Sequence, residues 1–403
     1  MKIAMVSEHA SPLAMVGGVD SGGQNLHVAE LAKALARRGH EVRVATRHDG
    51  STPGGSVEFA PGVVVDHVSA GPAEPLPKDD LLPFMPDFGA RLADAWASDP
   101  PDLVHAHFWM SGLAALTGAR QRDIPVLQTF HALGSVKQRH QGSKDTSPAG
   151  RVRLESAIAR SVAKVIATCS DEVFELARLG VRRRQISVVP CGVDLDQFTD
   201  HGPVAPRTDR PRILSVGRLV ERKGFDVLIH ALPAVPDAEL LIAGGPPAAE
   251  LDGYPEARRL RSLAAECGVA ERVHLLGAVS RDQMPALMRS ADVVACAPWY
   301  EPFGMVPVEA MACGVPVVAA AVGGLTDTVI DGVTGVLVPP RRPDRMAAAL
   351  RTVLSDQSLR LGFRAAALDR ARSRYAWDRI AAETHRIYSE VAAHAKGRMG
   401  AAR

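Results

Sequence analysis

The sequence predicts an α/β protein built from two doubly wound parallel sheets, and three observations support this. Short β-branched runs alternate with longer helical patterns along the chain, which is typical of right-handed βαβ units and parallel sheets. The pattern restarts after the proline-rich segment 201–211. A chain of 403 residues is also long for a single hydrophobic core. We therefore expect two domains that meet near residues 195–210, and a final amphipathic helix that could pack on either of them.

The individual elements follow from these runs. In the first half we expect a helix over 25–39 and strands at 2–7, 41–47, 63–69, 102–108, 125–130, 164–169 and 186–190. In the second half we expect strands at 212–218, 238–245, 272–277, 292–298, 316–321 and 335–340. Open α/β sheets bind ligands outside the carboxyl ends of their strands, so we expect the two domains to face each other across one cleft.

The composition excludes several classes of protein. The net charge is +2 and no basic motif is present, so no nucleic-acid partner is expected. No apolar run approaches the roughly 18 residues of a membrane-spanning helix, and the amino-terminal MKIAMVS is too short for a secretory signal. The five cysteines lack zinc-like spacing, which indicates reduced thiols and a cytoplasmic protein.

A glycine-rich loop, VGGVDSGGQN (16–25), lies between the first strand and its helix. Glycines allow backbone N–H groups to approach a ligand closely, and a helix amino terminus favours an anion. The spacing matches neither the dinucleotide fingerprint nor the P-loop. Gly22 and Gly23 are therefore candidate ligand contacts, while Asp20, Gln24 and Asn25 offer groups suited to hydroxyls; the alternative is a flexible loop.

Histidines end two of the expected strands, in HAHFW (105–109) and FHALG (130–134). The spacing of His105 and His107 is compatible with a metal, but the sequence offers no evident third ligand, and a lone histidine is more often structural. Asp194 and Asp196 have the spacing of a metal-binding D-x-D, yet their position near the domain boundary favours a turn. We expect no catalytic metal.

The segment SVGRLVERKGFDVLI (215–229) reads as a strand, a charged loop and a helix. Arg218 and Lys223 lie between Gly217 and Gly224, close to the start of the helix. Two fixed cations in this position can hold a diphosphate and neutralise a leaving group. The alternative is an ordinary exposed loop.

The stretch EPFGMVPVEAMACG (301–314) places two glutamates eight residues apart at the start of an apolar helix. Glu301 follows a strand, where a carboxylate can accept hydrogen bonds from sugar hydroxyls. Glu309, about two turns on, could reach a second diol such as a ribose. Two diols separated by a diphosphate describe a nucleotide sugar; the alternative is a helix start with one solvated carboxylate.

These motifs together resemble a known family. E-PFGMVPV-E, GRLVERK, VVPCGVDLDQF and GGLTDTVIDGVTG are similar to the GT-B retaining glycosyltransferases of family 4. SPLAMVGGVDSGGQNLHVAELAKAL, HAHFWMSG and FHALGSVK resemble the branch of D-inositol-3-phosphate glycosyltransferases and sucrose-phosphate synthases. The resemblance implies two Rossmann-like domains facing across a cleft: 1–200 for the acceptor, with a helix at about 377–403 packing back on it, and 201–376 for the nucleotide sugar.

The resemblance also implies roles for the donor-site residues. Transfer would retain the anomeric configuration through an oxocarbenium-like transition state. His131 would contact the donor sugar, Arg218 and Lys223 the diphosphate, and Glu301 the sugar; these four are the candidate catalytic residues. The remaining donor contacts would be Gly22, Gly23, Arg281 beside the base, Glu309 on the ribose, and backbone groups of Phe303, Gly304, Met305 and Val306.

The acceptor positions carry over less completely. His9, Asp20, Gln24, Asn25, Lys78 and Arg151 fit the pattern of the inositol-phosphate enzymes. Phe108 and Ala132 stand where that pattern has a tyrosine and a threonine. Each lost hydrogen bond to a charged group typically costs ~1.5–3 kcal/mol. A cyclitol, an aminocyclitol or a sugar therefore fits at least as well as inositol phosphate.

The expected activity is transfer of a hexose or N-acetylhexosamine to a hydroxyl of such an acceptor, without a cofactor. A UDP-linked donor is favoured, and GDP- and ADP-sugars stay open. A structural Mg²⁺ held by backbone carbonyls near 288–291 and a homodimer are both compatible with the sequence. A nicotinamide-dependent epimerase is excluded, because none of the four tyrosines is followed by a lysine four residues later. A sucrose-phosphate-synthase-like enzyme, a glycan or glycolipid transferase and a non-enzymatic nucleotide-sugar-binding protein remain alternatives.

Overall fold

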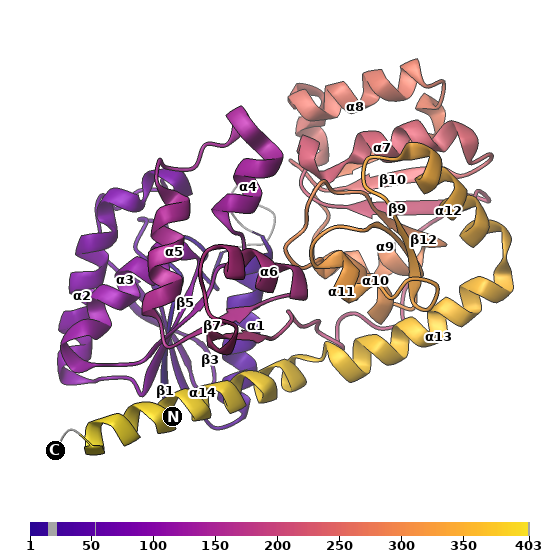
Figure 1. Ribbon diagram of the computed structural model, residues 1–403. Coiled ribbons are helices and arrows are strands. Elements are labelled where there is room, and N and C mark those ends of the chain that lie inside the picture. The colour runs from indigo at the N-terminus through magenta and orange to yellow at the C-terminus, as the bar shows by residue number, and fades with distance from the viewer. Residues whose placement is uncertain (15–21, 53, 402–403) are drawn as a thin grey trace. The chain divides into compact units, whose positions relative to one another are not determined.

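The computed structural model of the chain describes residues 1–14, 22–52 and 54–401 (Figure 1). It divides the chain into two compact units. Unit 1 comprises Met1–Cys191 together with Trp377–Arg403, and unit 2 comprises Gly192–Ala376. Both units are α/β, so the predicted fold class of two Rossmann-like domains is confirmed.

The boundary lies at 191/192, nine residues before the expected 200/201 (200 − 191 = 9). Val193 pairs with Ala376 in an isolated parallel bridge, and its N–H donates to the carbonyl of Tyr375 (2.8 Å). The Asp200 carboxylate accepts hydrogen bonds from Arg364 and from a second arginine of the same helix. These contacts hold residues 192–200 on unit 2, so the proline-rich segment 201–211 follows the boundary and does not mark it.

Unit 1 contains an eight-stranded sheet in the order β3-β4-β2-β1-β5-β6-β7-β8, in which all neighbours are parallel except β3 and β4. Its strands are β1 Lys2–Val6, β2 Glu41–Arg47, β3 Gly55–Ala60, β4 Val63–Val68, β5 Leu103–His107, β6 Val126–Thr129, β7 Lys164–Ala167 and β8 Ile186–Val188. Its helices are α1 Gly23–Arg37, α2 Met85–Ser98, α3 Trp109–Ala119, α4 Gly134–Gln141, α5 Arg151–Ser161, α6 Ser170–Arg178 and α14 Trp377–Ala401.

The sequence analysis missed strand β3. This strand lies at the edge of the sheet and runs antiparallel to β4, and most of its side chains are exposed. An edge strand that buries so little has no hydrophobic run to reveal it. The Pro61-Gly62 pair that follows it was the available signal, because this dipeptide marks a tight connection.

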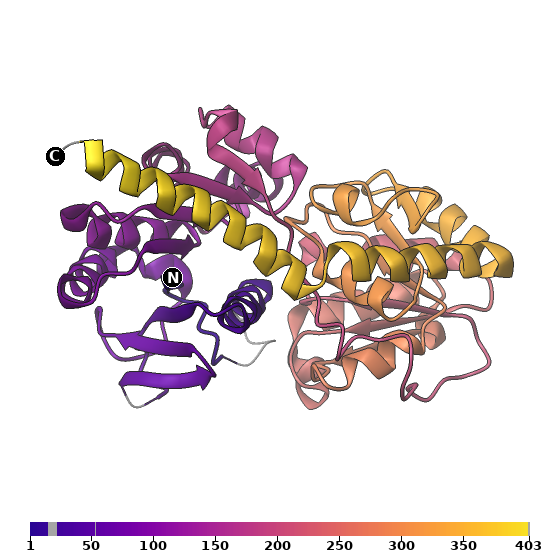
Figure 2. The same ribbon diagram turned by 90° about the horizontal axis from the view of Figure 1, so that it is seen from below.

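The last helix, α14, packs on unit 1. Ile380, Ala381 and Tyr388 belong to the same buried cluster as the inner side chains of α1, β1 and β2. In the same contact, Arg37 donates to Asp378 (2.8 Å) at the exposed edge, and the buried His40 lies 2.9 Å from a ring nitrogen of His385. Figure 2 shows α14, in yellow, running along this unit.

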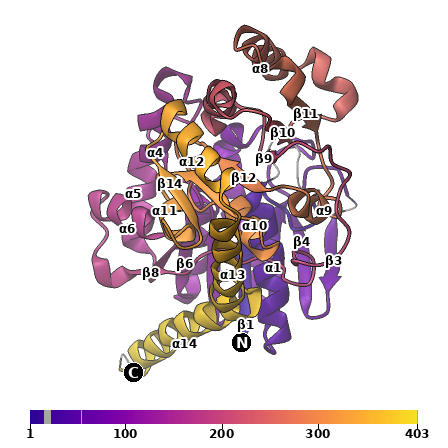
Figure 3. The ribbon, with the colours of Figure 1, turned by 90° about the vertical axis from the view of Figure 1, so that its right-hand side faces the viewer.

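Unit 2 contains a six-stranded, fully parallel sheet in the order β11-β10-β9-β12-β13-β14 (Figure 3). Its strands are β9 Arg212–Val216, β10 Glu239–Ala243, β11 Val273–Gly277, β12 Val293–Cys296, β13 Val317–Ala320 and β14 Gly335–Val338. Its helices are α7 Phe225–Ala231, α8 Pro255–Glu266, α9 Met284–Arg289, α10 Met305–Ala312, α11 Leu325–Thr328, α12 Pro343–Ser355 and α13 Gln357–Arg374.

Each sheet has one point where the strand order reverses, between β1 and β5 in unit 1 and between β9 and β12 in unit 2. Loops that leave the carboxyl ends of two such strands diverge, and ligands bind in the crevice between them. The segments that follow these four strands are therefore where a site is expected in each unit. None of the described helices is long and apolar enough to cross a membrane.

Candidate functional site

In unit 2, the loop after β9 carries the predicted cations. A short 3-10 turn, Glu221–Lys223, ends at Gly224, which has φ 68° and precedes α7. A Cβ at Gly224 would lie 1.9 Å from the carbonyl oxygen of Ala297, just beyond β12. Glycine is therefore required here, because it lets the loop after β9 press against the end of β12.

This approach brings Lys223 to Glu301. The Lys223 ammonium donates to the Glu301 carboxylate at 2.6 Å, and both side chains are about four-fifths buried. Burial acts to raise the pKa of the Glu301 carboxyl, but the charges of Lys223, Arg222 and Arg218 and the Lys223 hydrogen bond outweigh it, so the pKa lies below its ordinary value. Glu301 is thus an ionised carboxylate among three cations at the switch point of the sheet.

The backbone after Glu301 forms a tight start to helix α10. Gly304 has φ 90°, and a Cβ there would lie 2.5 Å from Leu325 Cδ2. The predicted contacts Met305 and Val306 are half-buried in the first turn of α10, where N–H groups have no partner within the helix. Phe303 is buried and packs edge-on against a tyrosine of unit 2.

The second glutamate of the motif, Glu309, lies inside α10 and is buried. Arg281 donates to it at 2.8 Å, and the same guanidinium lies over the ring of Phe198, 4.8 Å from the centroid. Burial raises the pKa of the Glu309 carboxyl, while the charge and hydrogen bond of Arg281 act to lower it. The structure therefore joins two residues that the sequence analysis assigned separately to the ribose and the base.

In unit 1, the described part of the glycine loop is held at the start of α1. Asn25 is buried; its Oδ1 accepts the Gly22 N–H (3.1 Å) and its Nδ2 donates to the carbonyl of Ser11 (3.0 Å). Gln24 Nε2 donates to the carbonyl of His107 at the end of β5 (3.2 Å). These contacts link the segments that follow β1 and β5. Asp20 lies outside the described residues.

His9 and Phe108 meet at the same switch point. Their ring centroids are 4.8 Å apart in an edge-on arrangement, and His9 Nδ1 lies 2.7 Å from the buried carboxylate of Glu8. Phe108 is itself buried and has φ 83°, an uncommon conformation for a residue with a side chain. Such a strained conformation persists only where the surrounding structure holds it in place, and it is found most often at functional sites.

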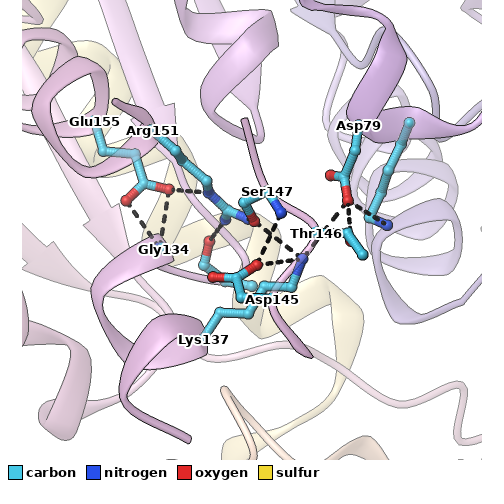
Figure 4. Close-up of polar contacts among 10 residues, drawn as sticks. Asp79, Gly134, Lys137, Asp145, Thr146, Ser147, Arg151 and Glu155 are labelled. Carbon is cyan, nitrogen blue, oxygen red and sulfur yellow. Dashed lines mark hydrogen bonds and ion pairs between the residues drawn. The ribbon is translucent and has the colours of Figure 1, made fainter. Parts of the chain in front are cut away.

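Arg151 lies at the centre of a polar network (Figure 4). It donates to the carboxylate of Glu155 (2.8 Å), the hydroxyl of Ser147 (3.1 Å) and the carbonyl of Ala132 (2.6 Å). Both oxygens of Glu155 accept from the Gly134 N–H (3.1 and 2.9 Å). The Arg151 guanidinium also lies over the ring of Phe108, 5.1 Å from its centroid. Two predicted acceptor residues, Arg151 and Phe108, are therefore in contact.

The same view shows residues that the sequence analysis missed. Lys137 forms an ion pair with Asp145 (3.0 Å) and lies 3.7 Å from Asp79 (Figure 4). Asp79 is also 3.9 Å from the predicted Lys78. Each of these cations has a carboxylate neighbour. For the Arg151–Glu155 ion pair, a signal was available in the sequence, because the two residues are four apart in one helix.

The histidines are distributed differently from what the sequence indicated. His105 is buried in unit 1, with its ring nitrogens 2.6 Å from Tyr388 Oη and 2.9 Å from Thr129 Oγ1, so it is a structural residue. His107 instead meets His131 across the carboxyl ends of β5 and β6 (Nδ1 to Nε2, 3.0 Å). A third ring, His27 of α1, approaches both. The sequence showed no evident third ligand beside His105 and His107, and the structure places His27 of α1 next to His107 and His131 but does not include His105 in that group.

Burial also sets the charge of these rings. It lowers the pKa of His131 well below its ordinary value, and the neighbouring histidines His27 and His105 lower it further. An imidazole of this kind is neutral at physiological pH and a weak proton acceptor. The contact with the donor sugar that the sequence analysis expected for His131 stays a prediction.

Other predicted features take simple forms. Asp194 Oδ1 accepts the N–H groups of Asp196 and Gln197 (2.9 and 3.1 Å), so the D-x-D segment is a turn, as expected. The Met288 carbonyl accepts the N–H of Ala291 (2.9 Å). The structural Mg²⁺ that the sequence was compatible with at 288–291 stays a prediction. The five cysteines form no disulfide.

A groove of about 1620 Å³ lies in unit 1 at the amino ends of the strands, away from the carboxyl ends that carry the residues described above. It is lined by residues around the amino ends of β6 and β7 and by the carboxyl-terminal part of α14. None of the described residues that the sequence analysis assigned to ligand binding lines it. The strained Phe108 and the Lys223–Glu301 ion pair lie at the switch points of the two sheets and not at this groove.

Comparison with known proteins follows the same division of the chain. Residues 21–197 match the model of "Glycosyltransferase Family 4", and residues 196–370 match that of "Glycosyl transferases group 1". A D-inositol 3-phosphate glycosyltransferase from Xylanimonas cellulosilytica is 40% identical, with 97% of each chain covered. The corresponding protein from Mycolicibacterium gilvum is 39% identical, with 93% of this chain and 86% of the relative covered.

Solved structures give the same picture. Sucrose-phosphate synthase from Thermosynechococcus elongatus superposes with a TM-score of 0.87 at 33% identity, over 98% of this chain and 99% of that one. Anabaena HepE, solved with UDP and glucose, shares the fold with a TM-score of 0.75 at 22% identity, over 97% of this chain and 100% of that one. This chain therefore belongs to the GT-B glycosyltransferases of family 4, in the group that includes the D-inositol 3-phosphate glycosyltransferases.

Proposed function

We propose that this enzyme transfers a hexose or N-acetylhexosamine, with retention of configuration, from a UDP-sugar to a hydroxyl of a cyclitol, aminocyclitol or sugar. The observation that carries the proposal is the ion pair of Lys223 with Glu301, beside Arg218, at the switch point of unit 2. It supports a site with cations for a diphosphate and an ionised carboxylate for a sugar.

Each donor-site residue would bind a different part of the nucleotide sugar. Arg218 and Lys223 would bind the diphosphate and neutralise the charge that develops as it leaves, so no metal is needed for that purpose. Glu301 would accept hydrogen bonds from the sugar, and its lowered pKa keeps it ionised for this role. The N–H groups of Met305 and Val306 would donate to the sugar and phosphates. Glu309, with Arg281, would bind the ribose and flank the base.

The reaction would proceed through an oxocarbenium-like transition state, with the acceptor hydroxyl attacking from the face that the diphosphate leaves. The sugar–phosphate C–O bond breaks, the new glycosidic bond forms, and the hydroxyl proton passes to the departing phosphate oxygen. His131 would contact the donor sugar as a neutral imidazole, consistent with its strongly lowered pKa. Gly22 and Gly23 would offer backbone groups to the donor.

The acceptor would bind in unit 1 at the network around Arg151. His9, Asp20, Gln24 and Lys78 would contact acceptor hydroxyls. The buried Asn25 would hold the glycine loop in place through its bonds to Gly22 and Ser11. Phe108 and Ala132 supply no hydroxyl there, and Arg151 is already paired with Glu155. Both features favour an unphosphorylated polyol.

A sugar phosphate is the second candidate acceptor. The superposition on a sucrose-phosphate synthase, with a TM-score of 0.87 at 33% identity, favours it. Initial rates with matched phosphorylated and unphosphorylated acceptors distinguish the two, and the anomeric configuration of the product, read by proton NMR, tests retention.

The donor site is tested by thermal unfolding with UDP, GDP, ADP and their sugars. A ligand that binds only the folded protein at 100 times its Kd adds about 2.7 kcal/mol to the free energy of unfolding. For a unit of this size that corresponds to a rise in Tm of about 5–11 °C. We expect this rise with uridine nucleotides and its loss in Arg218→Ala and Glu309→Ala.

Arg261→Ala is the matched control, since this arginine is an exposed residue of unit 2 paired with Asp252. It should keep the full rise. A protein that no nucleotide stabilises, or variants at Arg218 and Glu309 that respond like Arg261→Ala, would overturn the donor site. A rise with GDP or ADP alone would keep the site and replace UDP.

A further inference from the structure

The groove at the amino ends of the unit 1 strands is formed by segments that are far apart in the sequence. Its walls come from the ends of α3 and α5, the start of β7, the segment between α6 and β8, and the carboxyl-terminal part of α14. All of these belong to one compact unit. The volume of about 1620 Å³ exceeds the roughly 300–1,000 Å³ of most small-molecule pockets, so an extended ligand fits this amino-end groove.

The amino-end groove carries an excess of positive charge. Of the described residues that line it, five are cations: Arg120, Arg160, Lys164, Arg182 and Arg184. Two are carboxylates, Asp123 and Glu390, and Glu390 already accepts a hydrogen bond from Arg386 (2.6 Å). The whole chain is nearly balanced, with 47 lysines and arginines against 45 acidic residues. The positive charge is therefore concentrated locally, and a concave surface of one sign attracts a ligand of the other.

The four arginines of the groove are available to a ligand. They are exposed, and within the described part of the chain none of their guanidinium groups has a hydrogen-bond or ion-pair partner. Lys164, by contrast, already donates to the carbonyl of Arg184 (3.0 Å). A guanidinium can bind a phosphate through two parallel hydrogen bonds. The groove thus presents four groups suited to an anion with several oxygens.

Helix dipoles explain part of this charge. Arg160 lies in the last turn of α5 and Arg120 follows the last residue of α3, and cations are favoured at the carboxyl ends of helices. Arg182 and Arg184 lie beyond the end of α6 at Arg178, so this explanation does not extend to them. These two arginines are the observation that points to a ligand.

The other side chains of the groove indicate what kind of anion fits. Leu113, Leu116 and Val391 line it and are half-buried, so they offer apolar contact beside the cations. No phenylalanine, tyrosine or tryptophan is among its described lining residues, so it lacks the aromatic surface on which single-stranded nucleic acids stack. A phosphate monoester carries a charge of about −1.5 to −2 at pH 7, so two of them match the excess of cations over carboxylates.

We propose that the amino-end groove binds an organic ligand with two phosphate groups, through Arg120, Arg160, Arg182 and Arg184. This chemistry occurs both in soluble bisphosphates and in the head groups of anionic lipids, and the test separates the two sources. The proposal does not depend on the transferase assignment, because none of the described residues proposed to bind the nucleotide sugar or the acceptor lines this groove.

The test has two arms, both with the full-length protein. The first is a calorimetric titration with hexanediol bisphosphate, which carries two phosphate groups on an apolar chain. The second is sedimentation with phosphatidylcholine vesicles that contain or lack cardiolipin, a lipid with two phosphate groups. Binding in the titration identifies a soluble ligand, and binding to cardiolipin vesicles alone identifies a lipid. In either arm, binding should weaken as salt is added.

The groove variant is Arg182→Ala/Arg184→Ala. It should bind the probe at least about 10-fold more weakly than the wild type, because hydrogen bonds to charged groups are lost. Arg120→Ala/Arg160→Ala is a second groove variant with the same expected loss. All four side chains are exposed, so we expect both variants to fold, and circular dichroism checks this.

Arg153→Ala/Arg183→Ala is the matched control, because it removes the same charge from the same segments. Arg153 lies on α5, as Arg160 does. Arg183 lies between two arginines of the groove, but its guanidinium donates to the carbonyl of Ile186 (3.1 Å). Neither control residue lines the groove, so the control should bind like the wild type.

Three results would overturn the proposal. The first is a wild type that binds neither probe more tightly than about 1 mM. The second is a control variant that loses as much affinity as the folded groove variants, which would make binding a general effect of net charge. The third is bisphosphate binding that is lost in Arg218→Ala and kept in the groove variants. That result would assign the probe to the donor site and leave the proposed function intact, whereas loss in the groove variants alone supports the amino-end groove whatever the donor is.

Discussion

The ion pair between Arg281 and Glu309 offers the sharpest test of how unit 2 is built. Arg281→Met removes the cation but keeps an unbranched side chain against Phe198. The carboxyl of Glu309 then stays buried inside α10 without its partner, and only about 8% of its side chain is exposed. Breaking such a pair leaves an uncompensated charge in the protein interior.

The size of the effect follows from burial. Removing one member of a buried pair typically costs ~3–5 kcal/mol. The Arg281 side chain is 24% exposed, so solvent screens part of the interaction and the lower end, about 3 kcal/mol, applies. For a unit of this size the corresponding fall in Tm is about 6–12 °C. Arg281→Met/Glu309→Met, which replaces the pair by apolar groups, should recover most of it.

The loss should also depend on pH. Burial already raises the pKa of Glu309 in the folded protein, and removing Arg281 removes both interactions that lower it. A carboxyl whose pKa is raised on folding stabilises the protein fully below its unfolded pKa and loses that contribution as pH rises through the folded value. The deficit of Arg281→Met should therefore be largest near about pH 8 and shrink towards about pH 5.

Differential scanning calorimetry of the full-length protein is the assay, because it resolves separate transitions when two units unfold independently. Arg261→Met is the control: it breaks an exposed pair with Asp252, and such pairs contribute at most about 1 kcal/mol. An Arg281→Met variant that melts like Arg261→Met at high pH would contradict this prediction. A deficit that is independent of pH, or a double variant that is no more stable than the single one, would contradict it as well.

Three further predictions concern activity and pH. Glu301→Gln removes the charged acceptor beside Lys223 and should lower kcat/KM about 10–100-fold, measured from initial rates with the nucleotide sugar; unchanged kinetics would exclude Glu301 from the site. Ala132→Thr restores a hydroxyl beside the Arg151 network and should raise kcat/KM for a phosphorylated acceptor about 10-fold or more relative to its unphosphorylated form. Burial raises the pKa of Glu172 to about 7, so its ionisation destabilises the fold as pH rises through that value. Glu172→Gln should therefore raise Tm above neutral pH and have no such effect near about pH 5, and equal shifts at both would contradict this sign.

The parts of the fold that sequence predicted are those whose pattern reflects burial. The central parallel strands of both sheets, such as β1, β5, β10 and β13, are buried almost throughout, so their apolar runs are nearly continuous and mark them clearly. Strand β3 is exposed at an edge and left no such run. The boundary was displaced because residues 192–200 are held on unit 2 by polar and backbone contacts, including those of Val193 and Asp200, which no hydrophobic pattern encodes.

The candidate site shows the same limit at the level of single residues. That Lys223 and Glu301 lie near each other could be predicted, because each follows a strand and the switch point of a parallel sheet brings such segments together. The partner of Glu309 could not, since the sequence gives the position of Arg281 but not the direction of its side chain.

His27 was hidden for a related reason. It lies on the inner face of an amphipathic helix, where a histidine is usually interpreted as a core residue, and only the fold brings its ring next to His107 and His131. The surroundings of a residue at the end of a strand can be predicted from the chain topology. The surroundings of a residue on a helix face depend on which element the helix packs against, which the sequence does not show. Polar residues on buried helix faces are therefore the ones to re-examine once an α/β fold is known.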